Sequence, residues 1–134
     1  MFDQLSKKAK ATASQEDMVA LWRAAYALDH WYFIARGEMT NITPFVGIVD
    51  ETPMLLGFTD SNKAIAFAKL NGLADEKGSP PLLHISPAGT ASMAASLSAK
   101  GVEALLMNHG PFGFFAPLQN LTPMLNYYSS DSQE

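Results

Sequence analysis

The chain has no cysteine among its 134 residues, which excludes disulfide bonds, thiolate metal ligands and cysteine nucleophiles. Charged residues are also scarce, because they make up 16% of the chain against the roughly 25% usual in soluble domains. The first thirteen residues lack the continuous apolar segment of a secretory signal, and no run of about 18 apolar residues exists. We therefore expect a cytoplasmic protein with no membrane partner.

Positive charge is sparse as well. The formal net charge is −4, and the one basic cluster is formed by Lys7, Lys8 and Lys10 near the N-terminus. Proteins that bind nucleic acid carry a basic stripe on a folded face, and this chain has none. We expect no nucleic-acid partner.

Apolar residues, by contrast, make up 48% of the chain. A chain of this length buries about two-thirds of its unfolded surface, enough for one core without cross-links. We therefore predict a single domain over residues 1–134, with a frayed tail at 129–134 and a loose leader at 1–13, for which a short helix is the alternative. The low charge also leaves room for an apolar contact patch or a subunit interface.

The hydrophobic periodicity predicts an alternation of helices and strands. Helical spacing follows capping residues at Ser14, Asp60 and Ser86, and a last helical segment spans 118–128. Short aromatic or β-branched runs predict six strands: 31–35, 45–49, 54–58, 82–85, 102–107 and 113–116. The order predicts an α+β (or α/β) fold, with a single mixed sheet of about five or six strands, partly antiparallel, packed with about four helices.

The polar residues do not form a recognisable catalytic or metal motif. His30, His84 and His109 are far apart in sequence, and zinc sites need three or four convergent ligands, so we expect no metal and no cofactor. Ser86 precedes Pro87 at a strand-to-helix turn, where a helix cap explains it. Asp60 and His109 both follow predicted strands and are expected on one rim, where loops often carry function.

The densest pattern is the segment 104–118, which reads as a strand, a His-Gly-Pro turn and a second strand. Its candidate binding residues lie in and after the turn: His109, Gly110, Pro111, Phe112, Phe114 and Phe115. Alternation along a strand puts Phe112 and Phe114 on one face and Phe115 on the other. One face is expected to be core, and the other is either covered by the last helix or exposed as a contact patch.

Three blocks of the chain resemble the N-terminal domain of the bacterial enhanced-serine-sensitivity (SseB) family. They are Leu-Trp-Arg-Ala-Ala-Tyr-Ala-Leu at 21–28, Phe-Thr-Asp at 58–60 with Ala64 and Phe67, and 108–117, of which Gly-Pro-Phe-Gly-Phe-Phe-Ala-Pro at 110–117 matches best. The likeness extends from Asp17 to Leu121. It implies no activity, cofactor or catalytic residues, because the family has none established. Typical members continue into a second domain to which these residues have no counterpart.

Three functional hypotheses follow. The first is a small non-catalytic bacterial protein-interaction module that binds a partner through the rim of Asp60 and the segment 109–115. The alternative is a small enzyme or ligand-binding protein with a pocket near Asp60, Ser86 and His109. The third is a homodimer that associates through an apolar face or a sheet edge.

Overall fold

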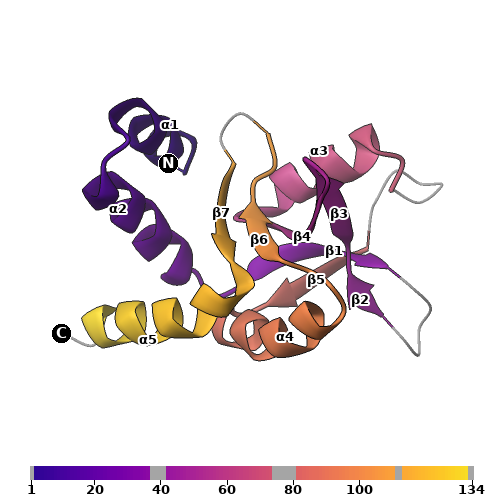
Figure 1. The fold of residues 1–134 in the computed structure, drawn as a ribbon. Coiled ribbons are helices and arrows are strands. Elements are labelled where there is room, and N and C mark those ends of the chain that lie inside the picture. Colours follow the sequence, from indigo (N-terminus) through magenta and orange to yellow (C-terminus); the bar gives the residue numbers. More distant parts are fainter. Residues whose placement is uncertain (1, 37–41, 74–80, 111–112, 133–134) are drawn as a thin grey trace.

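The structure is a computed structural model that describes residues 2–36, 42–73, 81–110 and 113–132 (Figure 1). Within those residues it has five α-helices and a seven-stranded mixed sheet. The predicted α+β class is therefore confirmed. The segment expected to be a leader forms a full helix, and a strand of two residues is present that the sequence did not predict.

The helices begin where the sequence predicts them to begin. Ser14, Asp60 and Ser86 are N-caps, and each side-chain oxygen accepts a hydrogen bond from the backbone N–H three residues on. The helices are α1 (Phe2–Thr12), α2 (Gln15–Tyr26), α3 (Ser61–Leu70), α4 (Pro87–Ala99) and α5 (Leu121–Ser132), the last preceded by the 3₁₀ helix η1 (Leu118–Asn120).

The strands form one sheet with a single parallel pair. They are β1 (Trp31–Arg36), β2 (Thr43–Pro44), β3 (Val46–Val49), β4 (Thr52–Phe58), β5 (Leu82–Ile85), β6 (Ala104–Met107) and β7 (Phe114–Pro117). The order is β2-β1-β4-β6-β7, with β3 paired to β4 and β5 paired to β1. Among the described residues, only the β4–β6 pairing is parallel. The chain travels between these two strands through α3, β5 and α4, which carry it back to the opposite end of the sheet.

The short strand β2 carries the chain from β1 to β4. Phe45 lies between β2 and β3, donates its N–H to Ile34 of β1 at 2.8 Å, and accepts from Leu56 of β4 at 3.4 Å. The β3–β4 hairpin that follows turns at Asp50 and Glu51, whose φ angles of 50° and 68° suit the tight turn that twisted strands favour. One polypeptide stretch thus fills the wedge between two diverging strands.

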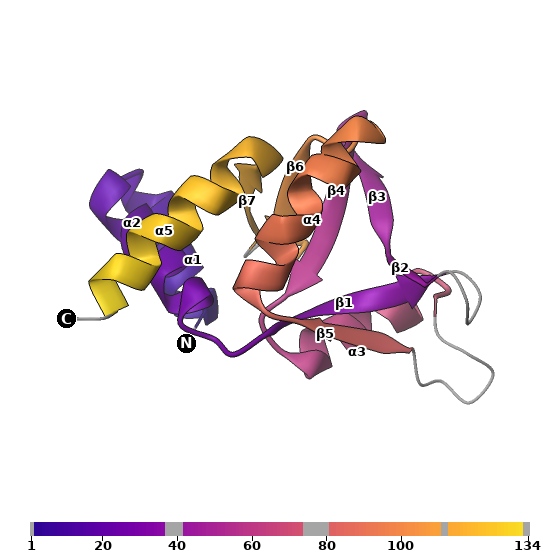
Figure 2. The same cartoon turned by 90° about the horizontal axis from the view of Figure 1, so that it is seen from below.

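Two apolar clusters hold the layers together. The larger joins α1, α2, α4 and α5 to one face of the sheet, and includes Trp22, Trp31 and Phe33. The smaller joins α3 to the other face through Ile34 and Phe58. Figures 1 and 2 place α1, α2 and α5 together at the β7 end of the molecule. Helices therefore cover the first face more fully than the second.

The segment expected to be a loose leader is instead a packed helix. Helix α1 contacts α2, and Ala9 is 2% exposed within the larger cluster. At the other end of the chain, α5 continues to Ser132, into the predicted tail. Helix α5 accommodates Pro123 in its first turn, where a backbone N–H has no intrahelical partner to lose.

Candidate functional site at the ends of β4 and β6

The parallel strands β4 and β6 end at the same edge of the sheet. Gly57 is in register with Met107, so the segments that follow the two strands emerge side by side. In mostly parallel open sheets, binding sites lie outside the carboxyl ends of the strands, and the β4–β6 pair has this arrangement locally. The topology therefore brings the residues after Phe58 next to those after Met107, although about fifty positions separate them in the sequence.

Asn108 joins these two segments. Its backbone N–H donates to Gly57 at 2.9 Å, its side-chain oxygen accepts from the Thr59 N–H at 2.9 Å, and its amide nitrogen donates to the Thr59 hydroxyl at 3.0 Å. The residue is 5% exposed and has a φ of 55°, a left-handed conformation that asparagine tolerates better than most residues. Sequence reasoning missed Asn108, although an asparagine between a strand and a His-Gly turn is a signal for this conformation.

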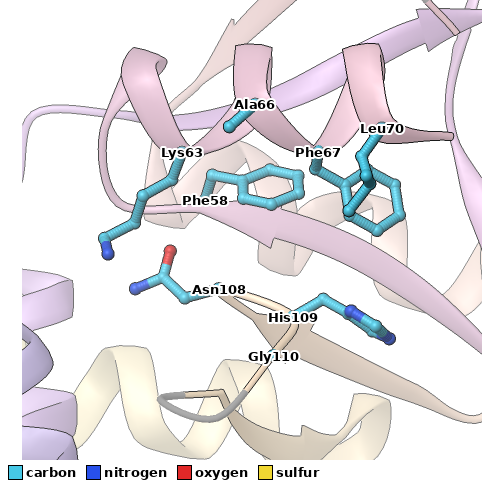
Figure 3. A pocket seen from close by; sticks show the side chains of 8 residues that line it. All are labelled: Phe58, Lys63, Ala66, Phe67, Leu70, Asn108, His109 and Gly110. Atoms are coloured by element: carbon cyan, nitrogen blue, oxygen red, sulfur yellow. The ribbon is translucent and has the colours of Figure 1, made fainter.

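A cavity of about 250 Å³ lies between α3 and the turn after β6 (Figure 3). Figure 3 shows Lys63 and Asn108 at one end, and Leu70, Phe67 and His109 at the other. The residues that line it are Phe58, Lys63, Ala66, Phe67, Leu70, Asn108, His109 and Gly110. One wall is therefore hydrocarbon, and the other presents an amide, an imidazole and a backbone turn.

The polar residues of this cavity are held by specific contacts. The His109 ring lies edge-on to Phe67, with ring centroids 5.4 Å apart and an interplanar angle of 66°. The Lys63 ammonium pairs with the Asp3 carboxylate at 2.6 Å, which ties α1 to α3 beside the cavity. His109 thus contacts an aromatic ring, and Lys63 is paired with an acid.

Among the described residues, His109 is the one member of the alternative pocket that lines this cavity. His109 and Gly110 line the cavity, whereas Asp60 and Ser86 are not among the described residues that line it. Both of those side chains are used as helix caps, as the sequence indicates. Gly110 has a φ of 133°, which only glycine adopts easily. Pro111 and Phe112 lie outside the described residues.

Phe114 and Phe115 point to opposite faces of β7. Phe114 is 4% exposed and meets Trp22 of α2 edge-on, with ring centroids 4.9 Å apart. Phe115 is 59% exposed and lies opposite Leu106 of β6. Phe114 is a core residue, so Phe115 is the one of these two rings that a partner can contact.

Phe115 belongs to an uncovered part of the second sheet face. Helix α3 packs on β1 and β4, and the same face continues across β6 to β7. Alternation and register place one set of apolar side chains on it, and we call this set the open face: Met54, Ala104, Leu106, Phe115 and Pro117. A hollow of about 530 Å³ lies over part of this set.

The remaining histidines form a pair, with His30 immediately before β1 and His84 on β5. The rings of His30 and His84 stack at 4.8 Å with planes 7° apart, and Tyr32 meets both edge-on. Nearly parallel stacked rings do not direct their nitrogens at one shared ion. In the described ranges, no group of three or more His, Cys, Asp or Glu side chains is placed to hold a metal.

Comparisons with known proteins do not identify the chain. No protein-family model matches the chain, and no curated protein matches it. Among the helices of the described residues, none has the length and apolar character needed to cross a membrane.

Proposed function

We propose that this chain is a non-catalytic bacterial protein-interaction module of the SseB N-terminal type, which binds a cytoplasmic protein partner through the open face and the adjoining cavity at His109. The observation that carries the proposal is Phe115. An aromatic ring 59% exposed on a sheet strand, next to the half-buried Leu106, Met54 and Pro117, forms an apolar patch. Contiguous patches of this kind mark interaction surfaces.

The cavity at His109 extends the open face at one end. Leu106 lies on β6 and Asn108 directly follows that strand, so the two features adjoin at the end of β6. The volume of the cavity, about 250 Å³, is below the roughly 300–1,000 Å³ of small-molecule sites. A cavity of this size suits one apolar side chain of a partner. An anchor side chain in a pocket beside an aromatic contact is how protein interfaces concentrate their affinity.

The hydrogen-bonding pattern of β7 favours docking on the face over pairing along the edge. The Leu118 N–H donates to Glu103, which pairs these two residues across β6 and β7. Alternation then directs the N–H of Phe115 away from β6, and Pro117, the next outward position, has no N–H to offer. An edge with one donor and a proline is a poor template for an added strand.

The test compares capture of partners by the intact protein with capture by two variants. Phe115→Asp places a charge on the open face. Tyr127→Asp places a charge on α5, at an aromatic residue that is 58% exposed against 59% for Phe115. We expect Phe115→Asp to reduce captured partner at least about tenfold in quantitative mass spectrometry, as loss of an interface hot spot does. Tyr127→Asp should leave capture unchanged. Equal capture by all three folded proteins contradicts the proposal, and recovery of the chain itself as the lost partner identifies a homodimer.

A further inference from the structure

A second, larger cavity lies on the other face of the sheet. Its volume is about 590 Å³, within the roughly 300–1,000 Å³ of small-molecule sites and more than twice the volume of the cavity at His109. It is bounded by one side of α4 and by the strands β2, β3 and the start of β4. Figure 2 shows α4 lying against β4 and β6, with β3 beyond them.

The cavity exists because of the side chains that α4 presents to it. Ser92 and Ser96 occupy positions one turn apart, and both line the cavity. Neither serine side chain is long enough to fill the space that the bend from β2 to β3 opens beside the helix. Met93 and Leu97, which also line it, stay half-buried. A leucine in place of either serine would close much of the gap.

The lining is apolar with one cation. Its hydrocarbon surface comes from both layers, namely Ile42, Pro44, Val46, Pro53, Met93, Leu97 and Val102. The polar lining residues are Lys100 and three with a hydroxyl, namely Thr43, Ser92 and Ser96. No carboxylate occurs among the described residues that line the cavity. Lys100 is exposed and caps the C-terminal end of α4. A hydrocarbon cavity with one ammonium group at its rim is complementary to an apolar molecule that ends in an anion.

We propose that this cavity is a binding site for an amphipathic monocarboxylate, whose apolar tail lies between α4 and the β2–β3 strands and whose carboxylate pairs with Lys100. The proposal is independent of the docking surface, since the two sites lie on opposite faces of the sheet. Burial of the tail supplies most of the affinity because apolar area is removed from water. The Lys100 pair supplies the preference for an acid.

The probe is decanoate below its micelle concentration, titrated into the intact protein by calorimetry, with decanol as the neutral match. Lys100→Gln should weaken decanoate binding by about fivefold, the size of a partly exposed ion pair, and leave decanol binding unchanged. Ser96→Leu fills the cavity and should abolish binding of both. Ala99→Leu, at an exposed position of α4 that does not line the cavity, is the control and should bind as the intact protein does.

Three results overturn the proposal. They are no saturable binding of decanoate by the intact protein, binding that survives Ser96→Leu, and decanoate binding that Lys100→Gln does not weaken. If the cavity instead receives a second copy of the chain, light scattering will show dimers that Ser96→Leu disperses, and decanoate will not bind. Circular dichroism of each variant verifies the fold, and substitution of an exposed serine by leucine on a helix favours that fold.

Discussion

Asn108 and Thr59 form a closed hydrogen-bonded pair at the ends of the two parallel strands. The Asn108 side-chain oxygen accepts from the Thr59 N–H at 2.9 Å, and its nitrogen donates to the Thr59 hydroxyl at 3.0 Å. This pair positions His109 at the cavity, because His109 is the next residue of the chain. The geometry of the candidate site therefore depends on a residue that is itself almost entirely buried.

Replacement of Asn108 by alanine should lower the free energy of unfolding by about 2–5 kcal/mol. The buried Thr59 N–H loses its acceptor, and alanine at a φ of 55° adds the strain of a left-handed residue. Asn108→Gly loses the same hydrogen bonds but adopts the left-handed conformation without strain, so it should be about 1–2 kcal/mol more stable than Asn108→Ala. Urea unfolding followed by circular dichroism measures both. Equal stability of the two variants would show that the backbone conformation carries no cost.

The two neighbouring phenylalanines of β7 should respond differently to truncation. Phe114→Ala removes a ring buried against Trp22 and should lower the free energy of unfolding by about 3–5 kcal/mol. Phe115→Ala removes an exposed ring and should change it by less than about 0.5 kcal/mol. The same urea experiment compares them. A large loss of stability from Phe115→Ala would mean that the open face is part of the core and not a docking surface.

Helix α1 should contribute to stability. Ala9 is 2% exposed, so Ala9→Arg must displace core side chains and should cost about 1–3 kcal/mol. Ala11→Arg, at an exposed position of the same helix, should stay within about 0.5 kcal/mol of the intact protein. Thermal unfolding of the two variants decides the matter. Identical melting temperatures of the two variants would indicate that residues 1–13 form the loose leader that the sequence predicts.

Stability should fall in alkaline solution because of Tyr26. Burial, and then the neighbouring Tyr128, raise the pKa of the Tyr26 phenol well above its usual range. In the unfolded chain the Tyr26 phenol ionises near about pH 10, whereas in the folded protein it stays protonated to a higher pH. The stabilisation is therefore complete below that pH and is lost as the pH rises above it. Burial also raises the pKa of Tyr128, which adds to the decline.

Tyr26→Phe should reduce this alkaline decline, measured as the urea midpoint across the pH range from neutral to strongly basic. At neutral pH the variant loses the hydrogen bond from the Tyr26 hydroxyl to Leu121 at 3.1 Å, a cost of about 1 kcal/mol. Tyr127→Phe, at an exposed position of α5, is the control for loss of a tyrosine hydroxyl at neutral pH. If the urea midpoint of Tyr26→Phe falls with pH as steeply as that of the intact protein, groups other than Tyr26 cause the decline.

Much of the fold was predictable because its signals are local. Ser14, Asp60 and Ser86 cap helices as their residue types indicate, and six of the strands carry clear aromatic or β-branched runs. Strand β2 was missed because two residues carry no periodicity. The packing of helix α1 was missed because its lysines and small residues do not reveal that α2 will cover Ala9.

The candidate site was predictable in part. Alternation separated Phe114 from Phe115, but which face is core depends on α2, which supplies Trp22 from a distant part of the chain. The pairing of Asn108 with Thr59 was hidden because it depends on the parallel register of β4 and β6. The resemblance to the SseB family and the function it suggests remain predictions.

The most direct measurement places a photo-reactive benzoylphenylalanine at position 115 in one sample and at position 127 in another, with cross-linking in living bacterial cells. The two positions are equally exposed aromatics on different elements, so background collisions are matched. The account predicts a discrete cross-linked species, identified by mass spectrometry, that forms from position 115 and is absent from position 127. The same products in equal yield from both positions, or no product from position 115, would contradict it.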